Sequence, residues 1–311
     1  MSVNAAPHTV PVLSFLIKNM HSQNSNSFHK PAALHKIWPG FFATAMLAEL
    51  FVSESAMAQV PSGAKKDADD WQFTLGAGVG YFADYEGSDD YDVAPLPLIG
   101  ISWRDTVSVG SVDGPPSLKV KFLKIKGPTP KDRLVLSTSL GYFFGRDQDD
   151  NVALGGLGDL DGGVTMKLSA DYRIKDFGAG VSIGRDLSGD REGTTLTATA
   201  RYSFALDSPR TQLTLGTSAT WADDNYMENI IGISAAQAAA SMLGYAAHNA
   251  ALEFKDVVVN VSIRHFWSRN VAITGMLGYK RLLGDAADSP IVDGQGSSSQ
   301  ISVLTGVSYR W

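Results

Sequence analysis

Few side chains in this sequence are of the types that carry out catalysis. The 311 residues include no cysteine, which excludes thiol nucleophiles, thiolate metal sites and disulfide bonds. The H-E-x-x-H motif of zinc proteases does not occur. The G-x-S-x-G pattern of serine hydrolases occurs at residues 180–184, within a predicted strand and not at the strand-to-helix turn that the hydrolase motif requires. His248 and His265 are the only histidines after residue 58, and neither has an evident partner of the kind that general-base catalysis needs. We therefore predict no catalytic residue and no cofactor.

Acidic residues gather in one segment, where clustered oxygen ligands could bind a divalent cation such as calcium. The residues of this segment are Asp84, Glu86, Asp89, Asp90 and Asp92. Their spacing does not match the twelve-residue calcium loop of an EF-hand. A loop whose charges remain in water is the better interpretation, and we predict no metal site. The same interpretation covers a second acidic group: Asp285, Asp288 and Asp293.

Charged residues of mostly positive sign recur on one face of segments in which polar and apolar residues alternate. These residues are Lys167, Asp171, Arg173, Arg201, Arg264 and Lys280. Successive side chains of a β-strand point to opposite faces, so we expect all six to face the interior of a barrel. A basic interior would favour anionic solutes, although side chains can also fill and close a barrel of this size.

The alternation predicts the strands that position these side chains. Residues 164–173, for example, set Val164, Met166 and Leu168 against polar neighbours, which is the pattern of a strand wetted on one side. Pro95 and Pro97 fit poorly in one such segment, since each removes a backbone donor. The pattern predicts about twelve strands, near residues 71–82, 92–103, 105–112, 117–126, 133–144, 162–174, 177–186, 194–205, 211–221, 252–267, 270–281 and 299–311.

The predicted strands are about ten residues or longer, which is the length that a tilted strand needs to cross a bilayer. Mostly long polar connections follow the odd strands and short ones follow the even strands, as in an outer-membrane barrel with extracellular loops and periplasmic turns. We therefore predict an all-β fold, a transmembrane antiparallel β-barrel of residues 71–311 with both termini in the periplasm. The alanine-rich residues 235–247 predict a short helix within the longest loop.

The first 58 residues resemble an export leader. Lysines precede the apolar residues 37–48, and Ala56-Met57-Ala58 forms an A-x-A cleavage pattern before Gln59. Met20 is a plausible true start. Because the leader carries three lysines against two glutamates, the remaining chain has a net charge of −7, which argues against nucleic acid as a partner. We expect residues 59–70 to form a periplasmic N-terminal segment.

The last strand ends on an aromatic residue that follows apolar residues at alternate positions. The residues on this face are Val303, Val307, Tyr309 and Trp311. This arrangement resembles the signal that the outer-membrane barrel assembly machinery recognises. We therefore expect that machinery and the outer-membrane lipids to be partners of this chain.

Three segments resemble the MipA/OmpV family of outer-membrane proteins. They are GAGVGYFADYEGSDDYDVAPLPLI at residues 76–99, GISAAQAAASMLGY at residues 232–245 and YKRLLGDAADSPIV at residues 279–292. The closing SYRW adds to the resemblance, which spans nearly the whole chain after the leader.

The resemblance implies a non-enzymatic barrel that acts as a scaffold for cell-wall enzymes. In the family's name-giving member, the partner is the lytic transglycosylase MltA, and a penicillin-binding protein is thought to be bridged to it. A solute pore and a surface adhesin remain alternatives. If the chain is a scaffold, we expect its partner to bind a basic periplasmic rim that consists of Lys65, Lys66, Lys131, Arg133, Arg210 and Arg269.

Overall fold

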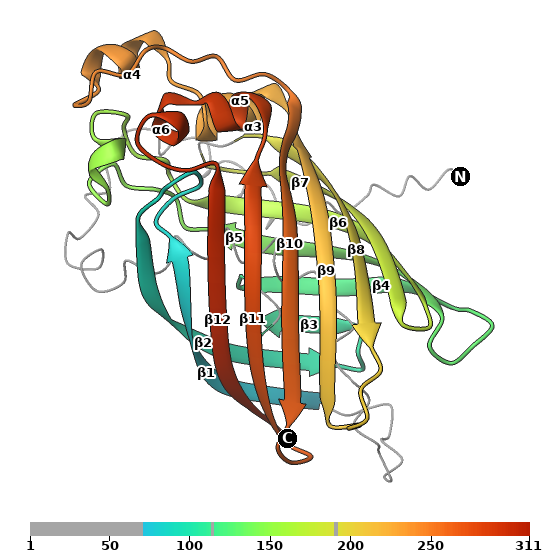
Figure 1. Ribbon diagram of the computed structural model, residues 1–311. Helices are drawn as coiled ribbons and strands as arrows, with labels where there is room; N and C mark the ends of the chain where they lie inside the picture. The colour runs from blue at the N-terminus through green and yellow to red at the C-terminus, as the bar shows by residue number, and fades with distance from the viewer. Residues whose placement is uncertain (1–70, 113–114, 190–191) are drawn as a thin grey trace, which may run out of the picture. The chain divides into compact units, whose positions relative to one another are not determined.

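The computed structural model describes residues 71–112, 115–189 and 192–311. These residues form a closed antiparallel barrel in which each strand pairs with its neighbours in sequence and β1 pairs with β12. Figure 1 shows the strands and the helices at one end of the barrel. The strands are β1 (Trp71–Ala83), β2 (Tyr91–Trp103), β3 (Val107–Gly110), β4 (Ser117–Lys126), β5 (Arg133–Phe143), β6 (Gly163–Ile174), β7 (Phe177–Asp186), β8 (Thr194–Phe204), β9 (Thr211–Ala222), β10 (Glu253–Phe266), β11 (Val271–Leu282) and β12 (Ser299–Arg310).

The predicted alternation gives the barrel an apolar outer face. In β10, Val257, Val259 and Val261 are exposed, whereas the side chains of Val258 and Asn260 are buried on the other face. The same two-residue period runs through β1 and β12. Exposed apolar side chains on every second position of long strands are what a lipid-facing surface requires. The predicted transmembrane barrel is confirmed.

The connections differ in length between the two ends of the barrel, as the sequence predicts. We call the end with residues 104–106, 127–132, 175–176, 205–210 and 267–270 the short-turn end, and the other the long-loop end. Four loops at the long-loop end, residues 84–90, 144–162, 223–252 and 283–298, are named together the cap loops.

The cap loops contain short helices that the sequence predicted only in part. These are η3 (Val152–Leu154), α3 (Asp224–Ile230), α4 (Ala235–Ala240), α5 (Gly284–Asp288) and α6 (Pro290–Asp293). The expected helix at 235–247 ends at Ala240, although its start is well defined: Ser234 and Gln237 form a reciprocal capping box. None of the described helices is long and apolar enough to cross a membrane.

The third strand is shorter than predicted, and its length explains the two prolines of β2. Residues 105–112 were expected to form this strand, but β3 covers only Val107–Gly110 and pairs with β2 from Gly100 onward. Ile99 directs its N–H toward Ser111, on the β3 side, and Pro95 and Pro97 share its orientation. Their missing donors therefore face an edge that no described strand pairs with. Proline is tolerated at such an edge and discourages further strand pairing.

Aromatic side chains cluster at both ends of the barrel wall. At the short-turn end, Trp71 lies 6.3 Å from Trp103, and Trp311 lies 5.2 Å from Tyr309, between ring centroids. At the long-loop end, Tyr81 stacks on Tyr91 at 4.9 Å. Amphipathic rings favour the headgroup layers, so the two groups suit the two edges of a bilayer.

A β-bulge at Phe122 decides which face of β4 carries its lysines. Lys121 pairs with Ser137 and Leu123 pairs with Leu136, so Phe122 is an extra residue in the strand. If Phe122 instead took an ordinary place in the strand, strict alternation would turn Lys124 and Lys126 to the opposite face from Lys119 and Lys121. Because Phe122 bulges out, all four lysines of β4 share the interior face, and the apolar residues face outward. The four are Lys119, Lys121, Lys124 and Lys126.

We predict that deleting Phe122 removes the bulge without impairing barrel assembly. The residues on its two sides then alternate strictly, so all four lysines keep the interior face. Deleting Val120 should instead impair assembly, because Lys119 and Lys121 become neighbours and one of them must face lipid, at a cost of about 2–4 kcal/mol near the bilayer midplane and less near its edges. Folding into liposomes, measured by the mobility shift of unheated protein in gel electrophoresis, should fall strongly for the Val120 deletion and match the wild type for the Phe122 deletion. Equal assembly of the two deletions would contradict the assigned orientation of the lysines.

Candidate functional site

A group of buried charges lies where the strands meet the cap loops. Glu86, from the loop between β1 and β2, accepts hydrogen bonds on Oε1 from Lys255 Nζ at 2.5 Å and from Lys280 Nζ at 3.0 Å. Lys255 also forms an ion pair with Asp256 at 2.5 Å. The side chains of Lys255 and Asp256 are 0% exposed, and that of Glu86 is 14% exposed. We call Glu86, Lys255, Asp256 and Lys280 the charge cluster.

A second β-bulge brings two consecutive charged residues to the interior. Phe254 pairs with Trp221 and Asp256 with Thr220, so Lys255 is the extra residue of β10. Ordinary alternation would send Lys255 and Asp256 to opposite faces, and one of them would contact lipid. The bulge places both inside the barrel, within reach of Lys280 on the neighbouring β11.

The two lysines keep Glu86 ionised despite its burial. Burial alone would raise the pKa of the Glu86 carboxyl, but the charges of Lys255 and Lys280 and their hydrogen bonds outweigh it and hold the pKa well below its usual range. Arg146, in the loop after β5, adds a further positive charge nearby, and burial lowers the pKa of its guanidinium to about 10. Glu86 is thus a permanent anion among cations.

The loop that carries Glu86 is also held by neutral hydrogen bonds. Gln300 on β12 donates from Nε2 to the carbonyl oxygens of Tyr85 at 3.1 Å and Ser88 at 2.9 Å. Gly87 accepts a backbone hydrogen bond from Ser297 at 2.8 Å. These contacts fix residues 84–90 against the strand ends on both sides of Glu86.

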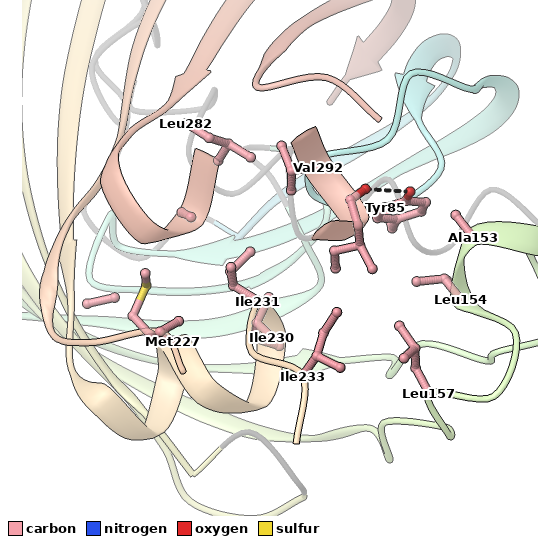
Figure 2. Close-up of a cluster of buried hydrophobic side chains, with 14 residues drawn as sticks. Tyr85, Ala153, Leu154, Leu157, Met227, Ile230, Ile231, Ile233, Leu282 and Val292 are labelled. Carbon is pink, nitrogen blue, oxygen red and sulfur yellow. Dashed lines mark hydrogen bonds between the residues drawn. The ribbon is translucent and has the colours of Figure 1, made fainter. Parts of the chain in front are cut away.

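Above the charge cluster, the four cap loops form one hydrophobic core. Figure 2 shows its side chains, and the Tyr85 hydroxyl donates a 3.1 Å hydrogen bond to the Ile291 carbonyl oxygen. The buried members are Tyr85, Ala153, Leu154, Leu157, Ala222, Met227, Ile230, Ile231, Ile233, Ala250, Leu282, Ala286, Ile291 and Val292. Burial of these apolar side chains stabilises the packing of the four loops against one another.

The cap core extends across the mouth of the barrel. In the cyclic strand order, the β5–β6 pair lies half-way round from the β11–β12 pair. Leu154, from the loop after β5, and Ile291, from the loop after β11, nevertheless belong to the same buried core. Hydrogen bonds from Gln237 to the Leu157 carbonyl oxygen at 2.7 Å and from Ser289 to the Ile231 carbonyl oxygen at 2.7 Å join the intervening loop to both. The cap loops therefore cover the long-loop end.

The acidic loop is less solvated than the sequence suggested. Glu86 is buried in ion pairs, which corrects the expectation that all the charges of this loop stay in water. Asp84 accepts a 3.0 Å hydrogen bond from Asn151, and burial raises the pKa of its carboxyl. Asp89 and Asp90 are exposed, as expected. Among the residues that the structure describes, no group of three histidine, aspartate or glutamate side chains could hold a metal ion.

The six residues predicted to face the interior all lie on the less exposed face of their strands. The structure brings Asp171 within 3.9 Å of Arg201, and Arg264 donates to Thr274 at 3.2 Å. Lys280 belongs to the charge cluster. Lys167 and Arg173 lie on the interior face of β6 with Asp171. At Lys280 the interior is not simply basic as the sequence suggested, because the loop residue Glu86 supplies a carboxylate.

The residues of the predicted rim are only partly assembled. Arg210 and Arg269 are exposed at the short-turn end, and Lys131 forms a 2.6 Å ion pair with Asp176 of the neighbouring turn. Arg133 lies on the interior face of β5, opposite Arg173, rather than on the outer edge of the rim. Lys65 and Lys66 lie outside the described residues.

The terminal aromatic face and the two histidines have clear positions. Val303, Val307 and Tyr309 point outward, and Trp311 is exposed while its backbone pairs with Phe73. Both histidines have hydrogen-bond partners. His248 donates from Nε2 to the Asp285 carbonyl oxygen at 2.9 Å, and His265 Nδ1 lies 2.9 Å from Thr211 Oγ1.

Alternation alone could not identify Lys255 and the β4 lysines as interior residues, but the sequence holds a signal for each. Phe254 and Val257 are separated by two charged residues instead of one, which breaks the two-residue period where the bulge occurs. In β4 the lysine spacing changes from two to three across Phe122 and then returns to two. A shift of phase between charged positions therefore marks each bulge.

Fold and site define a class of protein: a membrane-spanning β-barrel of the outer-membrane type, whose long-loop end is covered by a cap joined to the wall through buried charges. The chain belongs to the family described as "MltA-interacting protein MipA", whose sequence profile matches residues 75–311. No curated protein shows significant sequence similarity to it.

Solved outer-membrane proteins match the chain at low sequence identity and with low TM-scores. A loop L8 deletion mutant of OmpT from Vibrio cholerae is 10% identical, with a TM-score of 0.36 over 79% of this chain and 100% of that chain. OprB of Pseudomonas putida is 8% identical, with a TM-score of 0.40 over 79% and 95% of the two chains. The outer membrane channel DcaP of Acinetobacter baumannii is 9% identical, with a TM-score of 0.34 over 80% and 100%.

We predict that Glu86→Ala loosens the cap. Removing one partner leaves Lys255 and Lys280 buried without their shared carboxylate, which costs about 3–5 kcal/mol for a buried ion pair. Limited proteolysis of the detergent-solubilised barrel should then cut residues 283–298 at a lower protease concentration than in the wild type. Asp89→Ala removes an exposed carboxylate from the same loop and should leave the digestion pattern unchanged.

The pH dependence of this effect follows from the lowered pKa of Glu86. Its contribution is fully present above about pH 4.3, the pKa of an unperturbed glutamate, and is lost as the pH falls toward the folded value. The difference between Glu86→Ala and the wild type should therefore be the same at about pH 7 and about pH 5. If the cap were equally resistant to protease in Glu86→Ala and in Asp89→Ala, the charge cluster would not be what holds the cap.

Proposed function

We propose that this protein is a non-enzymatic barrel of the outer membrane that acts as a scaffold for a periplasmic cell-wall enzyme of the lytic transglycosylase class. Family membership supports this proposal, since the family is described by its interaction with MltA. The observation that carries it is the cap. A long-loop end covered by a hydrophobic core suits a scaffold better than an open conduit, and it leaves the short-turn end as the surface for partners.

The orientation that this function requires has the cap outside the cell and the short turns in the periplasm, as in outer-membrane barrels generally. Trp311 and Phe73 pair at the short-turn end, so both ends of the barrel chain would be periplasmic. In this orientation the outward face of Val303, Val307 and Tyr309 is the part of the last strand that the barrel assembly machinery would recognise.

The docking surface is the short-turn rim with residues 59–70. Arg210 and Arg269 are exposed cations of this rim, whereas Lys131 pairs with Asp176. The two arginines suit an acidic patch on the partner, and binding through them would weaken as salt increases. The turns are short, so we expect their area to be below the roughly 800 Å² per partner of a standard interface. We infer a weak, transient contact that suffices because an enzyme anchored to the same membrane gains effective concentration. A penicillin-binding protein would join through the enzyme.

A pore for anionic solutes is the second candidate, and one observation favours it. The interior face of β4 to β8 is rich in lysine and arginine, with Lys121, Lys124 and Arg173 among them. Such a wall would attract anions. The cap argues against continuous conduction, so this function would require the cap to open.

We predict that deleting residues 59–68 abolishes co-purification with a lytic transglycosylase while the barrel still assembles. The charge reversals Arg210→Glu and Arg269→Glu together should weaken the contact at least tenfold, because both remove positive charge from the rim and add negative charge. Pull-down from membranes at several salt concentrations measures both effects.

Arg281→Glu is the control, since Arg281 lies at the long-loop end, where it donates to Ser299 at 2.7 Å. It should bind the enzyme as the wild type does. Undiminished, salt-insensitive binding by the deletion variant would show that the interface lies elsewhere.

A further inference from the structure

The strand register arranges basic residues of the interior wall in a row across the short-turn end. Lys126 pairs with Arg133, and Arg133 pairs with Arg173. Arg173 also pairs with Gly178 of β7, and Gly178 in turn pairs with Arg201 of β8. Directly opposed residues on one face of a sheet lie about 4.5–5.5 Å apart between Cβ atoms. Four cations from four strands therefore lie on one side of the interior.

A glycine makes the close approach of these side chains possible. A Cβ atom at Gly178 would lie 2.7 Å from Arg201 Nε and 3.0 Å from Arg201 Cγ, so the guanidinium stem crosses the space that a side chain would occupy. At Gly180, a Cβ atom would lie 2.8 Å from Asp171 Oδ1. The glycines on the interior face of β7 thus leave space that charged side chains from both neighbouring strands occupy.

Among the described residues, cations outnumber carboxylates on this wall. Its cations are Lys119, Lys121, Lys124, Lys126, Arg133, Lys167, Arg173 and Arg201. Its carboxylates are Asp171, which lies 3.9 Å from Arg201, Asp186 at the long-loop end of β7, and Asp105, which pairs with Lys121 at 2.8 Å and Lys124 at 3.2 Å. We call these cations the basic wall.

The spacing of like charges has an energetic consequence. Arg173 lies within electrostatic reach of both Arg133 and Arg201. Like charges directly opposite on a sheet destabilise it, and an anion between them would relieve this repulsion. The bulge at Phe122 adds to the effect, because it keeps Lys124 and Lys126 on the interior face together with Lys119 and Lys121.

Hydroxyl groups lie beside the cations. The register places Ser137, Ser169, Ser182 and Thr197 in one row that begins at Lys121. Serine and threonine hydroxyls donate hydrogen bonds to anion oxygens, and lysine and arginine supply charge-assisted ones. The wall therefore offers both kinds of donor over several strands.

The dimensions of the basic wall fit an extended ligand. Successive interior residues of one strand are about 6.7 Å apart, so the four lysines of β4 extend over roughly 20 Å. We propose that the basic wall binds a linear oligo-anion, with repeated carboxylate or phosphate groups, that enters from the short-turn end. This site is distinct from the docking rim, and only its periplasmic access rests on the orientation proposed above.

Access from the short-turn end follows from the cap and from side-chain exposure. The cap loops cover the opposite end. The side chains of Lys121 and Lys124 are 18% and 35% exposed, and Arg133 is the first residue of β5 after the turn 127–132. An anion that approaches from the short-turn end would meet Lys126 and Arg133 first.

The test is binding of fluorescein-labelled hexaglutamate to the detergent-solubilised full chain, measured by fluorescence anisotropy. The wild type should bind it, the affinity should fall as salt increases, and free glutamate should compete at least a hundredfold less well. Lys119→Gln with Lys126→Gln should weaken binding at least tenfold, as should Arg173→Gln alone. Lys119→Arg with Lys126→Arg should retain it.

Arg185→Gln with Arg281→Gln is the matched control, because it removes two cations from outward positions of β7 and β11. Binding by this control should stay within twofold of the wild type. Failure of the wild type to bind hexaglutamate at low salt, or an equal loss in control and wall variants, would overturn the proposal. The assay contains no enzyme partner, so its outcome is independent of whether the scaffold function holds.

Discussion

The structure depends on one buried carboxylate that two lysines share. Glu86 reaches from the first cap loop to Lys255 and Lys280 on two adjacent strands. Together with Asp256, which pairs with Lys255, they make four charges taken out of water, and the attraction between these charges offsets the cost only while all four are in place. The cap core above them includes Tyr85 of this loop, so the loop that the charge cluster holds packs against the other cap loops. The charge cluster therefore connects the strands of the barrel wall to the cap loops that cover the long-loop end.

Bulges let this barrel carry charges inside without exposing them to lipid. In a membrane-spanning strand, each side chain faces either lipid or the interior, and strict alternation forbids two consecutive interior residues. The extra residues at Phe122 and Lys255 suspend this rule at two places. One keeps the lysines of β4 on the interior face, and the other completes the charge cluster. A β-bulge thus contributes both to the closed cap and to the basic wall.

Much of the barrel could be predicted from the sequence, because alternation, strand length and turn spacing are local properties. Most strand ends agree with the prediction within one residue, and the alternation of long and short connections is confirmed. The exception is β3, whose short length depends on the path of its neighbours and not on its own residues. The cap could not be predicted. Leu154 and Ile291 meet only because the closed barrel brings distant loops together, and Glu86 has the same local pattern as its solvated neighbours.

The most direct test of the central claim, that the charge cluster holds the cap across the barrel, is the conductance of the purified barrel in planar bilayers. The account predicts that the wild type is silent and that Glu86→Ala produces steady, salt-dependent openings, while Asp89→Ala remains silent. A wild-type barrel that conducts continuously, with a conductance that Glu86→Ala does not change, would contradict it.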